Sequence, residues 1–255
     1  MATALAAGAI DAQVFQGSQL IFVEPSEKQR EVLLRQFPES EIASESSVLL
    51  SACEQVILAV KPHILKEIAG ELAAGASQKN LFVSIAAGIS LANLRAMLAT
   101  KRVIRVMPNT PCQVGEGASG LAADEGVSKA DLDWARQLME SVGLVEQVPD
   151  QLMHAVTGVS GSSPAYLYLV IEALSDGGVA QGLPRAMATK LAAQAVVGAG
   201  KMVLESGLHP GALKDQVTSP GGTTIAALRE LEASGVRSAF IEAVAACAER
   251  SEELG

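Results

Sequence analysis

The chain has 255 residues and a formal net charge of −9, with 28 acidic against 19 basic residues. It is 49% hydrophobic but only 3% aromatic, so alanine, valine, leucine and glycine must build its core. An acidic chain without a cluster of lysine and arginine is poorly suited to nucleic acid or to an anionic membrane, and we expect neither as a partner. The length is sufficient for two domains.

The cysteines indicate a reducing environment. Cys53, Cys112 and Cys247 are odd in number and far apart, and no pair has the spacing of a metal or redox site. We therefore expect a cytoplasmic protein without a metal site. The most apolar run, residues 191–200, is too short to span a bilayer.

The first half of the chain alternates between strand and helix patterns. Apolar segments at 20–23, 55–60, 81–85 and 103–107 alternate with helical patterns at 26–36, 62–74 and 91–98. This alternation predicts a parallel sheet covered on both faces, with ligands at the carboxyl ends of the strands. Two weaker strands, at 119–122 and 144–148, flank a predicted helix at 128–141.

After Pro149 the pattern becomes helical. We expect helices at 163–175, at 183–207, from Thr223 onward and at 237–254, while residues 176–178 either break the first helix or pack tightly. The helix at 183–207 is apolar nearly all round. Such a helix needs cover on every side, so we predict a homo-oligomer with these helices at the interface.

A candidate anion site lies at residues 218–225, where a proline and two glycines precede the helix that starts near Thr223. The first amides of a helix lack internal partners and carry partial positive charge, and glycines let a ligand approach the backbone. Gly221, Gly222, Thr223 and Thr224 therefore form a candidate cup for a carboxylate or phosphate. Taken alone, the local sequence favours a plain turn and helix cap, and it is the rest of the chain that supports the functional interpretation.

A dinucleotide fingerprint is weak in this sequence. The only Gly-x-Gly-x-x-Gly match, at residues 115–120, follows no apolar strand and opens no helix pattern. We interpret it as a loop that binds no pyrophosphate.

Several segments in order resemble pyrroline-5-carboxylate reductases. They are residues 59–62, 84–89, 105–111, 155–166, 176–178, 209–211 and 218–225. The resemblance implies an α/β Rossmann-type dinucleotide-binding domain in residues 1–149, followed by an all-α substrate-binding and oligomerisation domain in residues 150–255. It also implies reduction of 1-pyrroline-5-carboxylate to L-proline, the last step of proline biosynthesis, by hydride transfer from NAD(P)H.

The resemblance also implies the roles of individual residues. The substrate would be held by Gly221, Gly222, Thr223, Ser160 and Gly161, with Thr224 as a catalytic group that hydrogen-bonds the ring nitrogen directly or through water. The cofactor would be lined by Ala59, Val60, Lys61, Pro62, Ala86, Met107, Pro108, Asn109 and Ser26.

The sequence does not decide between NADPH and NADH, because two observations point in opposite directions. The family generally prefers the phosphorylated cofactor. Glu24, however, lies at the end of a predicted strand, where its carboxylate suits a ribose 2′-hydroxyl and repels a 2′-phosphate.

The sequence departs from the family pattern in two places. Ser163 stands where the family has glycine, and the family's first strand and phosphate-binding glycine turn have no counterpart at the start. We expect the true start to lie upstream, and the missing strand to leave the middle of the sheet open.

Two alternative functions follow from these features. Residues 198–201 are similar to the lysine helix of β-hydroxyacid dehydrogenases, but Glu205 stands where that family has asparagine. The other alternative is an oligomeric helical module that lacks a cofactor site.

Overall fold

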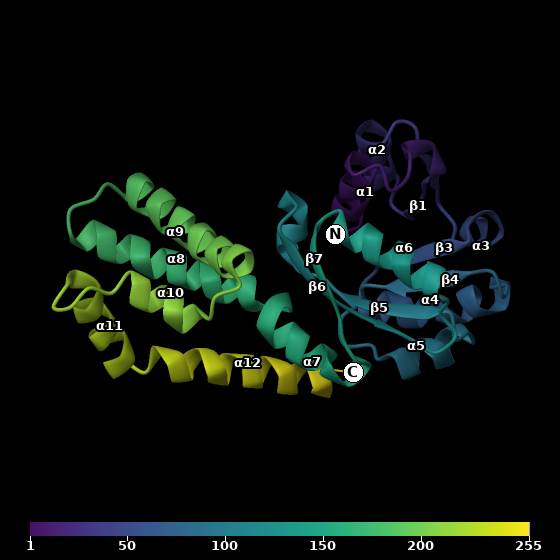
Figure 1. Cartoon of the computed structure of the whole chain (residues 1–255). Coiled ribbons are helices and arrows are strands. Elements are labelled where there is room, and N and C mark those ends of the chain that lie inside the picture. Colours follow the sequence, from purple (N-terminus) through teal and green to yellow (C-terminus); the bar gives the residue numbers. More distant parts are fainter. Residues whose placement is uncertain (255) are drawn as a thin grey trace. The chain divides into compact units, whose positions relative to one another are not determined.

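A computed structural model describes the backbone of residues 1–254 and their side chains, except those of residues 47 and 48. The chain divides into two compact units (Figure 1). Unit 1 comprises Met1–Gly161 together with the last residues from Ala246 onward, and unit 2 comprises Ser162–Ala245. Unit 1 contains all the described strands, and unit 2 is helical, as the fold class predicted.

Unit 1 contains a five-stranded sheet. Its order is β3 (Gln55–Leu58), β4 (Leu81–Ser84), β5 (Val103–Met107), β6 (Gly117–Ala123) and β7 (Gly143–Gln147). Strands β3 to β5 are parallel, as predicted, but β6 is antiparallel to β5. The reason is the short link: a 3₁₀ helix, Thr110–Val114, ends at the left-handed Gly115 (φ +74°) and returns the chain directly. A parallel crossover needs a dozen or more residues.

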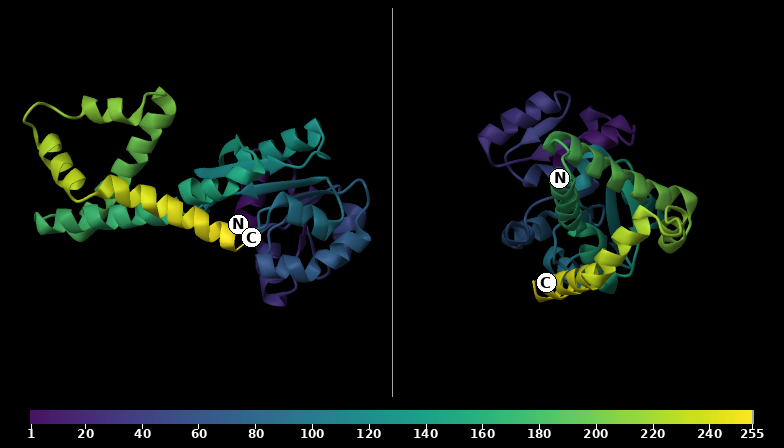
Figure 2. Two further views of the ribbon diagram at one scale, coloured as in Figure 1. Left: turned by 90° about the horizontal axis from the view of Figure 1, so that it is seen from below. Right: turned by 90° about the vertical axis from the view of Figure 1, so that its left-hand side faces the viewer.

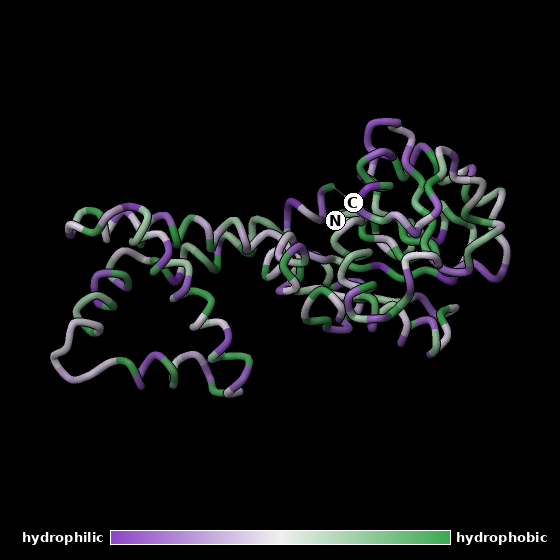
Figure 3. The backbone as a smooth tube through the Cα atoms, turned by 90° about the horizontal axis from the view of Figure 1, so that it is seen from above, coloured by the Kyte–Doolittle hydropathy of each residue, from purple (hydrophilic) through white to green (hydrophobic). Residues whose placement is uncertain are grey.

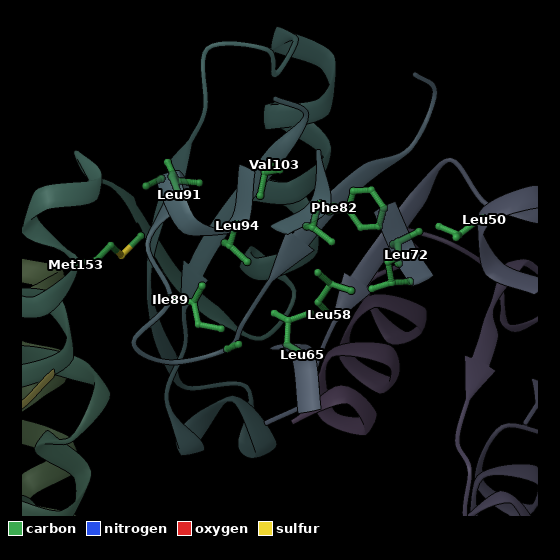
Figure 4. Packing of buried hydrophobic residues seen from close by; sticks show 14 residues of the cluster. Leu50, Leu58, Leu65, Leu72, Phe82, Ile89, Leu91, Leu94, Val103 and Met153 are labelled. Atoms are coloured by element: carbon green, nitrogen blue, oxygen red, sulfur yellow. The ribbon is translucent and has the colours of Figure 1, made fainter. Parts of the chain in front are cut away.

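Helices cover both faces of this sheet, because successive side chains of each strand point to opposite faces and both sets are apolar. Helices α4 (Pro62–Gly75) and α5 (Leu91–Leu98) pack on one face, where Leu65 and Leu94 meet Leu58, Phe82 and Val103 (Figure 4). Helices α1 (Ala2–Asp11) and α6 (Lys129–Glu140) cover the opposite face with Val83, Ile104 and Val106. The predicted two-sided cover is therefore confirmed.

A second, smaller sheet holds β1 (Ile21–Val23) parallel to β2 (Glu41–Ala43). Helix α2 (Glu27–Gln36) covers it, and the Phe22 and Phe37 rings pack in a tilted arrangement with centroids 5.0 Å apart. The sequence reasoning missed β2 and the short helix α3 (Ser47–Ala52).

A cleft of about 360 Å³ separates the two sheets of unit 1. All residues of β1 and β3 line it, together with Leu5 and Ala6 of α1. Within residues 1–254 no strand pairs with β1 and β3 across this cleft, so the middle of the sheet is open, as expected.

Unit 2 consists of helices joined by short turns (Figure 2). They are α8 (Ser163–Ala180), α9 (Arg185–Ser206), α10 (Pro210–Gln216), α11 (Thr223–Ala233) and most of α12 (Val236–Glu253), which ends in unit 1. Helix α8 continues through residues 176–178. A Cβ on Gly178 would lie 3.1 Å from the Ala188 Cβ of α9, so Gly178 permits tight packing between the two helices. Neither Gly177 nor Gly178 breaks the helix.

Apolar and polar stretches alternate along the helices of unit 2 (Figure 3). Many of its large apolar side chains are exposed. On α9 alone, Met187, Leu191, Met202 and Leu204 are between 51% and 70% exposed. Among the described residues, none of the helices combines the length and the apolar character that crossing a bilayer requires.

The boundary between the compact units lies after Gly161. Unit 1 extends to Gly161 because the short helix α7 (Met153–Val156) packs on the sheet. A Cβ on Gly120 of β6 would lie 2.8 Å from Cγ1 of Val156 and 3.4 Å from the Met153 sulfur. The sequence reasoning assigned neither α7 nor α10.

Candidate active site

The parallel strands bring most of the predicted cofactor residues to one edge of the sheet. Leu58 of β3 is opposite Ser84 of β4, and Ser84 is opposite Arg105 of β5. The segments that follow these strands therefore leave the sheet side by side. They contain Ala59, Val60, Lys61 and Pro62 after β3, Ala86 after β4, and Met107, Pro108 and Asn109 at the end of β5.

The segment after β3 leads directly into α4. Lys61 is the residue before the helix and Pro62 occupies its first turn, where a missing N–H costs nothing. Val60 and Lys61 are exposed, whereas Ala86 after β4 is buried in the core with 3% exposure. Val60 and Lys61 are thus available to a ligand, whereas Ala86 packs in the core beneath this edge of the sheet.

The end of β5 is joined to the segment that carries Ser160 and Gly161. The Asn109 side chain donates from Nδ2 to the Ser160 carbonyl at 3.0 Å and accepts at Oδ1 from the Ala118 N–H at 3.0 Å. A Cβ on Gly161 would lie 2.7 Å from Cε of Met107, so only glycine fits against this methionine as it stands. The structure therefore brings together residues that the sequence places about 50 positions apart.

Ser160 and Gly161 end a π-helical turn, Thr157–Gly161. Such turns are rare in proteins, and those that occur are often found at functional sites. The Thr157 hydroxyl donates to the Met153 carbonyl at 2.8 Å, and the Ser160 hydroxyl donates to the Val156 carbonyl at 3.1 Å. The sequence reasoning missed this turn, although hydroxyl side chains interleaved with Gly158 and Gly161 were a signal for a distorted helix.

The predicted ribose-binding residues lie at the end of β1. The Ser26 N–H donates to Oε1 of Glu24 at 2.9 Å. Arg30 donates to the backbone carbonyls of Glu24 and Pro25 at 3.0 and 2.6 Å. The Glu24 carboxylate is thereby held at the strand end, where an acidic group suits a ribose hydroxyl.

The predicted anion cup lies in unit 2, at the start of α11. Helix α11 begins at Thr223, as predicted, and in the described chain no side chain caps it. Gly221 has a left-handed backbone (φ +66°), and a Cβ on Gly222 would lie 2.3 Å from the Ser219 Oγ. The left-handed backbone at Gly221 favours glycine, and a side chain at residue 222 would require Ser219 to shift. The first amides of α11 lack a side-chain acceptor among the described residues.

The candidate residues thus divide between the units. The predicted cofactor residues, including Ser26, lie in unit 1 with Ser160 and Gly161, whereas residues 221–224 lie in unit 2. Among the described residues, no three His, Cys, Asp or Glu side chains gather as metal ligands would.

One buried ion pair near this edge was missed by the sequence reasoning. Arg105 of β5 is 2% exposed, and its Nη1 lies 2.8 Å from Oδ1 of Asp150. The other carboxylate oxygen of Asp150 accepts from the Leu91 N–H at 3.0 Å, at the start of α5. An arginine within an otherwise apolar strand was the available signal, because a buried charge requires a partner.

Cys112 lies just beyond the same strand and is buried, with 2% exposure. Burial raises the pKa of its thiol, which keeps the sulfur protonated and unreactive. It behaves as a small hydrophobic residue.

The comparisons with known proteins cover both units. The family model described as pyrroline-5-carboxylate reductase dimerisation matches residues 150–254, and that described as NADP oxidoreductase, coenzyme F420-dependent, matches residues 1–88. A pyrroline-5-carboxylate reductase of Synechocystis is 44% identical over 255 residues, which cover 100% of this chain and 95% of the relative. The chain belongs to the pyrroline-5-carboxylate reductase family.

Further pyrroline-5-carboxylate reductases agree along the whole chain. That of Pisum sativum is 43% identical and is matched over 92% of its length by 100% of this chain. The solved structure from Coxiella burnetii has a TM-score of 0.92 at 32% identity, covering 100% of this chain and 94% of that one. The reductase of Plasmodium falciparum with NADP bound has a TM-score of 0.87 at 31% identity, covering 99% and 93%.

Proposed function

We propose that this chain reduces 1-pyrroline-5-carboxylate to L-proline with a hydride from NAD(P)H, the last step of proline biosynthesis. The observation that carries the proposal is 44% identity along the whole chain to a reductase of this family. The β-hydroxyacid dehydrogenase alternative has only the lysine helix in its favour, and Glu205 of this chain departs from that pattern.

The cofactor would bind at the carboxyl edge of β3, β4 and β5, where NAD(P)H supplies the hydride. The edge fits this role because the parallel register brings three strand ends together, the position where open α/β sheets hold nucleotides. Val60, Lys61, Pro62 and Met107 would line it. Ala86 and Pro108, which are both buried, would support it from below.

The substrate carboxylate would bind at the start of α11. Gly221 and Gly222 keep the turn open, and the first amides of the helix offer N–H donors and partial positive charge. Ser160 and Gly161 are further residues proposed to bind the substrate. A protonated imine is already electrophilic, so the protein needs chiefly to align the donor and acceptor carbons.

Thr224 would hydrogen-bond the ring nitrogen directly or through water. We expect Thr224→Ala to raise the substrate KM or lower kcat. The matched control is Thr218→Ala, because the Thr218 hydroxyl donates within its own turn to the Lys214 carbonyl at 2.7 Å. Unchanged kinetics in Thr224→Ala would remove this residue from the mechanism.

Self-association is part of the same proposal. The matched family model describes dimerisation for residues 150–254, and α9 exposes Met187, Leu191, Met202 and Leu204. Large exposed apolar faces of this kind mark protein interfaces. We propose a dimer or larger homo-oligomer in the cytoplasm, without nucleic acid or membrane as partners. A constant monomer mass in light scattering across a wide concentration range would contradict the oligomer.

One observation favours the second candidate, an oligomeric module without cofactor. The cleft between β1 and β3 leaves the sheet open beside the proposed cofactor edge. Fluorescence titration with NADPH and NADH separates the two candidates, using this chain and one extended upstream by a strand and glycine turn of about ten residues. Binding by either form supports the reductase, and binding by neither supports the module.

A further inference from the structure

Asn109 lies where the segment after β5 meets the π-helical turn, and it is almost fully enclosed, with 7% exposure. Its Oδ1 accepts from the Ala118 N–H and its Nδ2 donates to the Ser160 carbonyl, each at 3.0 Å. An N–H must meet the oxygen and a carbonyl must meet the nitrogen, so these partners define the orientation of the amide. Both ends of the side chain are thus engaged by the backbone of other segments.

We propose that Asn109 is a positioning residue, which clamps residues 107–109 to the π-helical turn and does not itself contact the cofactor. The inference rests on the proposed function, because that function assigns Met107 to the cofactor and Ser160 and Gly161 to the substrate. Through this clamp, Asn109 would set the distance between the two groups of contacts.

A second contact between the same segments supports the clamp. Cε of Met107 lies 2.7 Å from where a Cβ of Gly161 would stand, and Cγ of Met107 lies 3.7 Å away. The two segments therefore meet twice, once through Asn109 and Ser160 and once through Met107 and Gly161. A carbonyl at the end of a helical turn needs a partner from outside it, and Asn109 supplies that partner for Ser160.

Loss of the clamp should affect the rate more than the binding. Hydride transfer requires reacting atoms about 3–3.5 Å apart, and a misplacement of about 1 Å can cost 100-fold in rate. The groups that hold the cofactor and the substrate carboxylate would remain, so their affinities should change little. The expected signature is a low kcat with a nearly constant KM.

The test compares Asn109→Asp with Asn80→Asp. Asn80 is a matched control: it is 1% exposed, its Nδ2 donates to the Leu50 and Cys53 carbonyls, and its Oδ1 accepts from the Ser77 N–H. Both variants place a carboxylate against a backbone carbonyl, but only Asn109 touches the proposed site.

We expect Asn109→Asp to lower kcat by roughly 10- to 100-fold with KM within about 3-fold, and Asn80→Asp to leave the kcat of folded protein within about 3-fold. The kcat of Asn109→Asp, taken relative to that of the unsubstituted chain at the same pH, should rise as pH falls. The reason is that a protonated carboxyl group can donate to the Ser160 carbonyl.

Hydrogen exchange provides a readout that does not require activity. Exchange in residues 157–161 should accelerate in Asn109→Asp and not in Asn80→Asp. If Asn109→Asp does not fold, Asn109→Ser removes the same donor without adding charge and is measured in its place. Equal effects of the Asn109 and Asn80 variants on kcat and on exchange would overturn the inference. An inactive unsubstituted chain would instead refute the proposed function, and the exchange comparison would then decide the clamp.

Discussion

Substituting Asp150 by alanine tests whether the Arg105–Asp150 ion pair holds unit 1 together. Arg105 is 2% exposed and Asp150 22%, and the carboxylate also accepts the Leu91 N–H at the start of α5. Removing one partner of a buried pair typically costs about 3–5 kcal/mol, because the remaining charge stays buried without compensation. Since Asp150 retains some solvent contact, we expect the lower end, about 3 kcal/mol. This corresponds to a fall in Tm of about 6–12 °C for a domain of this size.

The measurement is calorimetry and urea unfolding at fixed protein concentration, because an oligomer's stability depends on concentration. The control is Glu230→Ala, which removes the partner of an exposed pair with Arg229 at 3.0 Å and should cost less than about 0.5 kcal/mol. The double variant Arg105→Met with Asp150→Leu should recover most of the loss, since no uncompensated charge remains. A loss below about 1 kcal/mol for Asp150→Ala would show that Arg105 finds another partner or water.

Three further outcomes are expected. Gly222→Ala should abolish substrate binding without unfolding unit 1, because its Cβ would lie 2.3 Å from the Ser219 Oγ at the start of α11; an unchanged KM would contradict this. Glu24→Ser should raise kcat/KM for NADPH relative to NADH, since it removes a carboxylate at the ribose position; an unchanged ratio argues against that position. Burial alone would raise the pKa of Asp131, but hydrogen bonds from Arg102 and Ser128 outweigh it and lower the pKa. The stability from this carboxylate should therefore be complete above about pH 4 and be lost as pH falls through the lower folded pKa. Acid unfolding of Asp131→Asn, which lacks this carboxylate, should show a weaker pH dependence.

Much of the fold could be predicted because its signals are local. Strands at β3, β4 and β5 follow from short apolar runs, and the start of α11 at Thr223 follows from the glycines before it. The same local reasoning could not decide whether Gly177 and Gly178 end α8. That outcome depends on Ala188 of the neighbouring helix, against which Gly178 packs.

The sequence could predict which residues form the candidate site, but not which of them contact one another. The motifs named Met107, Asn109, Ser160 and Gly161 as separate contacts for cofactor and substrate. The structure shows Asn109 bonded to Ser160, 51 positions away, and Met107 packed against Gly161. The sequence could therefore place Asn109 in the site, but it could not show that Asn109 links the segment after β5 to the π-helical turn.

The sequence by itself determined the strands of the larger sheet and the longer helices, including the start of α11 after its glycines, because periodicity, helix caps and backbone freedom act among neighbouring residues. Only the tertiary structure decided that β6 runs antiparallel to β5, that Asn109 is bonded to Ser160, and that Arg105 is paired with Asp150. These features depend on residues far apart in the chain. Their partners are selected by packing and by the need to satisfy buried polar groups, and no local pattern records that selection.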